Sequence, residues 1–166
     1  MKTLYLLRHA KSSWENPGLK DFERPLNERG TSDVPVMAER FNVRKKKVDC
    51  IIASPAQRAK TTARLFARGI HYPEDNIASN PELYFAGTGM LLKAASLADD
   101  TCESVMLVGH NPAITEFANA MAGCDIDNVP TCGLVELTLP VAHWADIELG
   151  GATLVEFDFP KNADND

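Results

Sequence analysis

The sequence predicts a three-layer α/β/α sandwich with a mainly parallel central sheet. Short apolar runs alternate along the chain with longer segments of helical character, and the stretches between the runs are long enough for the crossovers that parallel strands require. The 166 residues, 45% hydrophobic and 24% charged, suit one globular domain. We therefore expect a single domain over residues 1–160, followed by a frayed acidic tail at residues 161–166.

The first apolar run is the strongest strand signal. Residues 4–7 are almost continuously apolar, which is typical of a central strand buried on both faces. Residues 27–44 then have helical character, with Asp33 as the expected N-cap and Pro35 in the first turn. We expect this helix to cover one face of the sheet.

The middle of the chain repeats the order of strand and helix. Residues 48–53 form a second apolar run that stops at a Ser-Pro pair, which predicts a strand followed by a turn. Residues 56–68 and 87–98 carry apolar side chains at helical spacing. Each is therefore predicted to be a helix.

The last third contains the remaining predicted elements. Residues 105–108 read as another buried strand, and residues 113–122 as the helix after it. Residues 134–139 and 154–159 are expected to form outer strands of the same sheet. Because these two strands lie close together in sequence, one of them is expected to run antiparallel.

Composition excludes several classes of function. The formal net charge of −6 disfavours nucleic acid as a partner, since its backbone would repel such a surface. No apolar stretch approaches the roughly 20 residues that cross a bilayer. The apolar stretch after Thr3 is too short for the core of a signal peptide, so we expect a cytoplasmic protein without a membrane partner.

The cysteines and the remaining histidines point to no metal and no cofactor. The cysteines lack paired spacing and have small or apolar neighbours, so all four are expected to be buried thiols rather than a disulfide or metal site. They are Cys50, Cys102, Cys124 and Cys132. Neither His71 nor His143 has a second histidine or a cysteine three or four positions away.

Chemically active side chains follow three of the buried strands. Arg8 and His9 follow the first, Ser54 and Arg58 follow the second, and His110 follows the third. In open α/β sheets, ligands bind beyond the carboxyl ends of the strands, so these residues are expected to meet there. That convergence is the main physical argument for an active site.

Such a group of residues suits a compact dianion such as phosphate. Guanidinium groups offer several fixed donors to phosphate oxygens and stay charged at any working pH. A neutral imidazole of His9 can attack phosphorus if its other ring nitrogen is held by an acceptor. Arg8, Arg58 and a protonated His110 would then stabilise the charge that develops on the phosphoryl oxygens.

Four sequence blocks carry a resemblance to a known family. They read LRHAKSSW at residues 7–14, RPLNERG at 24–30, SPAQRAKTT at 54–62 and VGHNP at 108–112. In this order they resemble the signatures of the histidine phosphatase superfamily, whose usual motif is Arg-His-Gly. The short chain and the Arg-His-Ala-Lys-Ser variant are similar to the SixA-type phosphohistidine phosphatase branch. The resemblance implies a phosphoglycerate mutase-like fold.

The resemblance also implies roles for individual residues. His9 matches the nucleophile, Arg8 and Arg58 match phosphate-binding arginines, and His110 matches the second histidine that contacts phosphate. Arg24 lies in a block near the site and is a further candidate phosphate contact.

Three positions depart from related branches. Ala10 replaces the usual glycine, a small change that should leave the nucleophile intact. Asn111 stands where acid phosphatases have an aspartate that acts as general acid. Glu15 stands where phosphoglycerate mutases have a substrate-binding asparagine, which counts against that substrate.

The sequence leaves the identity of the general acid open. Glu82 is the best candidate, because an acidic residue follows a similar strand in the mutase branch, but it can equally be a surface carboxylate. An imidazole leaving group needs little help from an acid, because its conjugate acid has a pKa near neutrality.

Three functions follow from this site. The first is a phosphatase that forms a phospho-His9 intermediate and acts on phosphohistidine in a protein. The second is a small-molecule phosphomonoesterase or mutase that uses the same site, which phosphate transfer to a second acceptor would reveal. The third is a non-catalytic module that binds a phosphate or phosphoprotein, although a pure binder would not need a nucleophile.

Overall fold

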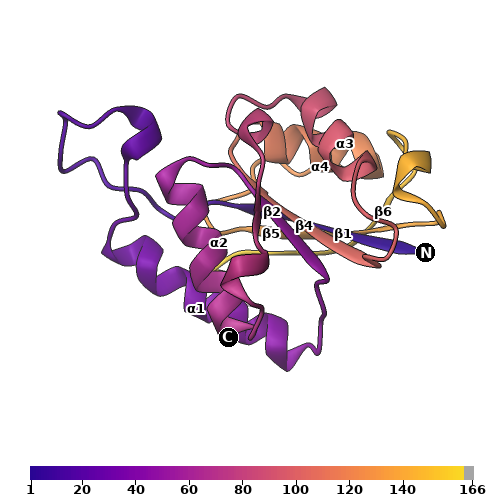
Figure 1. The fold of residues 1–166 in the computed structure, drawn as a ribbon, viewed down its shortest axis with the longest axis horizontal. Coiled ribbons are helices and arrows are strands. Elements are labelled where there is room, and N and C mark those ends of the chain that lie inside the picture. Colours follow the sequence, from indigo (N-terminus) through magenta and orange to yellow (C-terminus); the bar gives the residue numbers. More distant parts are fainter. Residues whose placement is uncertain (163–166) are drawn as a thin grey trace.

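A six-stranded sheet with helices on both faces forms the part of the chain that the structure describes, residues 1–162 of a computed structural model (Figure 1). The strands lie in the order β3-β2-β4-β1-β5-β6. Their bounds are β1 Lys2–Arg8, β2 Cys50–Ala53, β3 Ala78–Ser79, β4 Ser104–Gly109, β5 Leu134–Leu139 and β6 Thr153–Asp158. The predicted central position of the first strand is confirmed.

Four α-helices cover the sheet, two on each face (Figure 1). They are α1 Glu28–Val43, α2 Gln57–Gly69, α3 Thr88–Ser96 and α4 Ala113–Ala122. In Figure 1, α1 and α2 lie below the sheet, and α3 and α4 lie above it. The predicted three-layer sandwich is therefore confirmed.

The four strands β1 to β4 are parallel to one another, whereas β5 pairs antiparallel with both β1 and β6. The expectation that one of the two last strands runs antiparallel is thus confirmed. The two-residue strand β3 was not predicted, because its side chains are exposed and carry no apolar pattern.

Alternation along β1 divides the core between the two faces of the sheet. Successive side chains of a strand point to opposite faces. Leu4 and Leu6 pack into the cluster that lies under α3 and α4, whereas Tyr5 and Leu7 pack into the cluster under α1 and α2. All four are buried, so β1 must be apolar on both sides, and this explains its continuous apolar run.

The start of α1 differs from the prediction. The N-cap is Asn27, whose Oδ1 accepts a hydrogen bond from the N–H of Gly30 at 2.8 Å. Asp33 lies inside the helix and pairs with Arg29 at 3.4 Å, and Pro35 also lies inside. Asparagine and aspartate are equally good caps, so the helix begins at the earlier one, where its first turn packs against the chain near Lys11.

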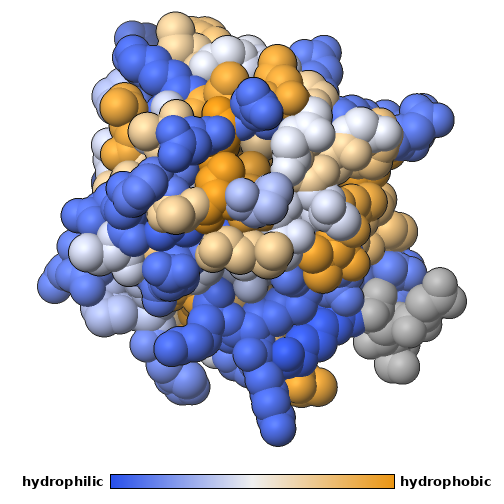
Figure 2. Space-filling view, turned by 90° about the vertical axis from the view of Figure 1, so that its right-hand side faces the viewer, coloured by the Kyte–Doolittle hydropathy of each residue, from blue (hydrophilic) through white to orange (hydrophobic). Residues whose placement is uncertain are grey.

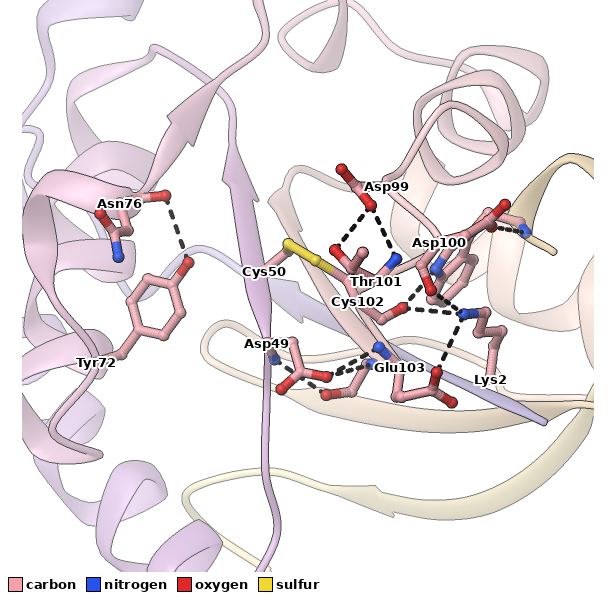
Figure 3. The surroundings of a disulfide bond; sticks show 12 residues. Lys2, Asp49, Cys50, Tyr72, Asn76, Asp99, Asp100, Thr101, Cys102 and Glu103 are labelled. Atoms are coloured by element: carbon pink, nitrogen blue, oxygen red, sulfur yellow. Dashed lines mark hydrogen bonds and ion pairs between the residues drawn. A yellow bond between two sulfur atoms is a disulfide. The ribbon is translucent and has the colours of Figure 1, made fainter. Parts of the chain in front are cut away.

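Two of the four cysteines form a disulfide, so the expectation of four buried thiols is wrong for Cys50 and Cys102. Figure 3 shows this bond between the start of β2 and the chain just before β4. The pair is 52 positions apart in sequence, and only the pairing of β2 with β4 brings it together. The other two cysteines are free; Cys132 is buried as expected, whereas Cys124 is only partly buried.

The surface seen from the side where β1 begins is mixed in polarity (Figure 2). Hydrophilic residues dominate at the height of α1, and hydrophobic patches lie between hydrophilic residues above it. Within residues 1–162, no helix combines the length and the apolar character that crossing a bilayer requires. Of the predicted frayed tail, Asn162 donates a hydrogen bond to Phe159, and residues 163–166 lie outside the described residues.

Gly30 allows α1 to pack directly on the loop that follows β1. A Cβ atom at this position would collide with the carbonyl oxygen of Lys11 and lie 2.9 Å from its nitrogen. We expect Gly30→Ala to lower the free energy of unfolding by about 1–3 kcal/mol, because the backbone on both sides must shift. Urea denaturation measures this change.

Gly89→Ala is the matched control. Gly89 lies in α3, and a Cβ atom there meets no atom within 4 Å. Alanine should stabilise this helix by roughly 0.5–1 kcal/mol. Equal effects of the two substitutions would contradict the proposed close packing at Gly30.

Candidate active site

The carboxyl ends of β1, β2 and β4 bring the predicted residues to one edge of the sheet. The N–H of His9 donates to the carbonyl of Gly109 at 3.0 Å, and the N–H of Ser54 donates to Val108, also at 3.0 Å. The rings of His9 and His110 have centroids 5.1 Å apart. The expected convergence of the three strand ends is therefore present.

His9 is held as a neutral imidazole. Its side chain is buried, and Nδ1 lies 2.7 Å from the carbonyl oxygen of Ala10. A carbonyl only accepts hydrogen bonds, so Nδ1 carries the proton and Nε2 keeps its lone pair. Burial lowers the pKa of His9 to about 3, and the nearby charges of Arg58 and Arg8 also lower it. The ring is therefore a free base at neutral pH.

The backbone of Ala10, whose carbonyl holds the ring of His9, is held in turn by Thr62. The N–H of Ala10 donates to Oγ1 of Thr62 at 2.9 Å, and this hydroxyl donates to the carbonyl of Arg58 at 2.7 Å. All three residues are buried, and these hydrogen bonds connect the end of β1 to α2. Alanine in place of the family's usual glycine fits here, with its side chain fully buried.

His110 lies beside His9 with one ring nitrogen bonded and one without a partner. Its Nε2 is 2.8 Å from Oγ of Ser54, and its Nδ1 is buried without a hydrogen-bond partner among residues 1–162. Burial, with a further contribution from Arg58, lowers the pKa of His110 to about 4. Burial and positive charge both favour the neutral ring in the protein alone, and a protonated His110 in the presence of a phosphoryl group stays a prediction.

Arg8 extends from the end of β1 toward the loop around residue 129. One of its terminal nitrogens donates to the carbonyl of Val129 at 2.9 Å, and its Nε is buried without a partner in the described chain. Asn111 donates to the same carbonyl at 2.9 Å and accepts hydrogen bonds from the N–H and hydroxyl of Thr115. Asn111 thus connects the start of α4 to the loop that holds Arg8.

Arg58 and Arg24 share one carboxylate partner, Asp21, in the short 3-10 helix η1 Asp21–Glu23. Arg58 donates to the carbonyl and to Oδ2 of Asp21 at 2.7 and 3.0 Å, and Arg24 donates to Oδ1 at 3.1 Å. The hydroxyl of Tyr84 donates to Oδ2 at 2.6 Å. These hydrogen bonds, first that of Tyr84 and then those of the arginines, lower the pKa of Asp21 to about 2.

Asp21 orients the two arginines without using all their donors. A guanidinium has five N–H groups, and Arg58 donates to Asp21 with one N–H from each of its two terminal nitrogens. Arg58 lies in the first turn of α2, where the helix dipole disfavours a cation and an anionic partner offsets that effect. The structure shows that Asp21 provides that partner from within the chain.

Arg24 contacts the loop that follows His9. It donates to the carbonyl of Ser13 at 3.1 Å and to Oγ of Ser12 at 2.5 Å. Its guanidinium carbon lies 3.3 Å from the centre of the Trp14 ring, in a cation–π contact. Arg24 therefore holds the loop after His9 in shape, and a phosphate contact by this residue stays a prediction.

Glu82 lies in the short helix η3 Pro81–Leu83 and is exposed. One of its carboxylate oxygens lies 3.2 Å from Nζ of Lys93 on α3. Its neighbour Tyr84 does reach the site, with a ring centroid 5.5 Å from that of His110. A role of Glu82 as general acid stays a prediction.

Sequence reasoning missed Asp21, Tyr84 and Thr62 as parts of this site. Asp21 stands three positions before Arg24, a spacing that allows an ion pair on one helical turn, and this signal was available. Tyr84 carries no comparable signal. Among the described residues, no group of three or more histidine, cysteine, aspartate or glutamate side chains is placed to hold a metal ion.

The fold and this site together define a class. An α/β sandwich with two histidines and two arginines at the carboxyl ends of parallel strands is suited to binding and transferring a phosphoryl group. Comparison with known sequences gives the family: residues 4–83 match the histidine phosphatase superfamily, branch 1.

Relatives that match nearly the whole chain indicate the same family. A solved structure proposed to be the phosphohistidine phosphatase SixA of Agrobacterium tumefaciens is 32% identical, with a TM-score of 0.80, and the match covers 96% of this chain and 98% of that one. An uncharacterized protein of Mycobacterium tuberculosis is 31% identical, covering 93% of this chain and 100% of its own. The chain belongs to the histidine phosphatase superfamily, in its SixA-type branch.

A more distant structure shares the fold alone. A mycobacterial glucosyl-3-phosphoglycerate phosphatase is 14% identical, with a TM-score of 0.65, and the match covers 96% of this chain and 98% of that one. Phosphatases of different substrates therefore have this architecture, and the protein is a phosphatase by family and by the make-up of its site.

The two buried histidines predict how stability depends on pH. Both pKa values lie below the ordinary value of about 6.5, at about 3 for His9 and about 4 for His110. As the pH falls below 6.5, the unfolded chain binds protons that the folded protein rejects, so stability is lost. The loss for each residue is up to about 1.4 kcal/mol per pH unit until its lowered pKa is reached.

We therefore expect the free energy of unfolding, measured by urea denaturation, to fall between pH 6.5 and pH 4. The double variant His9→Asn, His110→Asn should have a flatter dependence over this window. The contribution of Asp21 falls outside it, because its pKa is lowered to about 2 and that stability is lost only below about pH 4. Identical slopes in wild type and variant would show that the histidines are not held neutral.

Asp21→Asn tests whether Asp21 positions the arginines. Removing the charge weakens hydrogen bonds to charged groups, each worth about 1.5–3 kcal/mol. We expect kcat/KM for an aryl phosphate to fall about tenfold or more. Glu23→Gln, an exposed carboxylate on the same short helix, is the control and should change kcat/KM less than twofold. A rise in activity of Asp21→Asn would mean that Asp21 competes with phosphate for Arg58.

Proposed function

We propose that this phosphatase removes the phosphoryl group from phosphohistidine on a protein, through a covalent phospho-His9 intermediate. The observation that carries the proposal is the state of His9: a buried, neutral imidazole whose Nδ1 is bonded to Ala10 and whose Nε2 is available for attack. Its neighbours His110, Arg8 and Arg58 are the groups that such a transfer requires.

The first step transfers the phosphoryl group to the enzyme. The lone pair on Nε2 of His9 forms a bond to phosphorus while the bond from phosphorus to the substrate's ring nitrogen breaks. The electrons of that bond go to the leaving nitrogen. When the other nitrogen of the substrate ring carries a proton, the ring leaves as neutral imidazole, so the step does not depend on a strong general acid.

The second step regenerates the enzyme. A water oxygen attacks phosphorus, the bond to Nε2 breaks, and its electrons return to His9 as inorganic phosphate is released with the proton of the water. Arg8 Nε and His110 Nδ1 are buried polar atoms without partners in the described chain. Such atoms need a hydrogen-bond partner, and a phosphoryl oxygen can supply it to both, given a proton on His110.

The dianion would also change the charge state of His110. Its pKa is lowered by burial and by Arg58, and a bound phosphoryl group opposes the second effect. Protonation of His110 would then accompany substrate binding. Its hydrogen bond to Ser54 holds the ring in place through that change.

Protein phosphohistidine is the preferred substrate because of the likeness to the structure from Agrobacterium tumefaciens. We place the protein in the cytoplasm, with a phosphorylated protein as partner and neither nucleic acid nor membrane, in line with its net charge of −6. Thiols are kept reduced in that compartment, so the disulfide between Cys50 and Cys102 counts against this placement.

His9→Ala tests the nucleophile. The variant should lose turnover of a phosphohistidine-bearing protein and of an aryl phosphate by at least about a thousandfold, because it lacks the imidazole nitrogen that forms the intermediate. Both assays contain a chelator, and mass spectrometry of the quenched wild type should find one phosphoryl group on the peptide that contains His9. Circular dichroism of the variant confirms that it is folded.

The two substrates separate the competing functions. Faster turnover of the phosphohistidine protein supports the proposal, whereas transfer of phosphate to a second small acceptor would indicate a mutase. Binding of the phosphoprotein by folded wild type without turnover of either substrate would mean that the site recognises phosphate without chemistry.

A further inference from the structure

Aromatic rings form a continuous path from His9 to the solvent. The ring of His110 lies between those of His9 and Tyr84, with centroid distances of 5.1 and 5.5 Å. Tyr84 in turn contacts Phe22 at 5.0 Å and Phe85 at 4.4 Å. Exposure rises along this path, from 8% at His9 to 40% at Phe22 and 88% at Phe85.

Trp14 adds a second side to this entrance. It is 76% exposed, and its ring is stacked on Arg24, which shares Asp21 with Arg58 and Tyr84. Within residues 1–162, the exposed aromatic side chains are Trp14, Phe22 and Phe85, and each is connected to the site by these contacts. We call these three residues the aromatic rim.

This placement favours a contact with another protein surface. Aromatic side chains gain the most from burial and are enriched at the centres of protein interfaces, where they contribute much of the binding energy. The remaining exposed large hydrophobic side chains are aliphatic or methionine, and include Val43 and Leu97. An aromatic cluster confined to the entrance of the site therefore needs an explanation that the phosphate chemistry does not supply.

The depth of His9 supplies that explanation. The nucleophile His9 is only 8% exposed, and the side chain of a substrate phosphohistidine is short. For the phosphoryl group to reach His9, the backbone of the substrate protein must therefore come close to the entrance. The side chains that flank the phosphohistidine then meet the rim. A free phosphorylated metabolite would make no such contact.

We propose that the aromatic rim is the docking surface for apolar side chains that flank the phosphohistidine on a folded partner protein. The inference rests on the proposed function and deepens it. Hydrogen bonds from Arg58, Arg24 and Tyr84 to Asp21 hold the rim in register with the phosphate site, so docking and in-line positioning of the phosphoryl group occur together.

The test compares the double variant Phe22→Ala, Phe85→Ala with wild type on two substrates. With a phosphohistidine-bearing protein, KM should rise about tenfold or more and kcat should stay within about twofold, because the lost contacts act on binding. With free phosphohistidine, the variant and wild type should agree within about twofold. Trp14 is left unchanged because it contacts Arg24.

The matched control is Val43→Ala, Leu97→Ala, which removes two other exposed hydrophobic side chains, at the ends of α1 and α3. It should leave both substrates unaffected. A rim variant whose KM for the protein stays at the wild-type value overturns the inference and leaves the proposed function intact. Equal losses on both substrates also overturn it, since the rim would then be part of the phosphate site.

Two further outcomes are distinguishable. Wild type that turns over free phosphohistidine but no phosphohistidine protein would defeat the proposed protein substrate and the docking surface with it. A dimer of wild type in sedimentation that the rim variant abolishes would assign the rim to a second copy of this chain, and would overturn the inference.

Discussion

The parallel register of β1 with β4 is the constraint on which the rest of the site depends. Arg8 pairs with Gly109, and the N–H of His9 donates to that glycine's carbonyl, so the residues that follow the two strands start side by side. The adjacent pairing of β2 with β4 places Ser54 next to them. Because sheet hydrogen bonds set these positions, the two histidines do not depend on flexible loops for their alignment. A one-residue slip of β1 would move every side chain of the strand to the opposite face and disturb the packing of both cores.

Electrostatics then divides the site into two layers. In the inner layer, burial and neighbouring guanidinium groups keep His9 and His110 neutral, which suits an attacking nitrogen and a ring that gains its proton only with the substrate. In the outer layer, Asp21 balances Arg58 and Arg24 with a carboxylate whose pKa is lowered to about 2. The positive charge that attracts a dianion is therefore stabilised in advance, and it is retained because Asp21 occupies only some of the arginine donors.

Features that depend on local sequence patterns could be predicted, whereas contacts between residues far apart in sequence could not. Leu4 to Leu7 and the other apolar runs are local patterns, so the strands, the helices and the meeting of Arg8, His9, Arg58 and His110 could be expected from sequence. Asp21 and Tyr84 meet across 63 positions, and Cys50 and Cys102 across 52. No local periodicity reports such contacts. The choice of Asn27 over Asp33 as N-cap likewise depends on the packing of Gly30 against Lys11, which is a tertiary effect.

The same division separates chemistry from recognition. Backbone pairing of β1, β2 and β4 positions the residues of the proposed phosphate site. The entrance, in contrast, is formed by side chains of residues 12–24 and 81–85. These two segments contact each other through the hydrogen bond between Asp21 and Tyr84 and the ring contact between Phe22 and Tyr84. Substitutions in these two segments can alter the entrance while leaving the strand register untouched. We therefore expect substrate choice to depend on these two entrance segments, while the strand register beneath them stays the same.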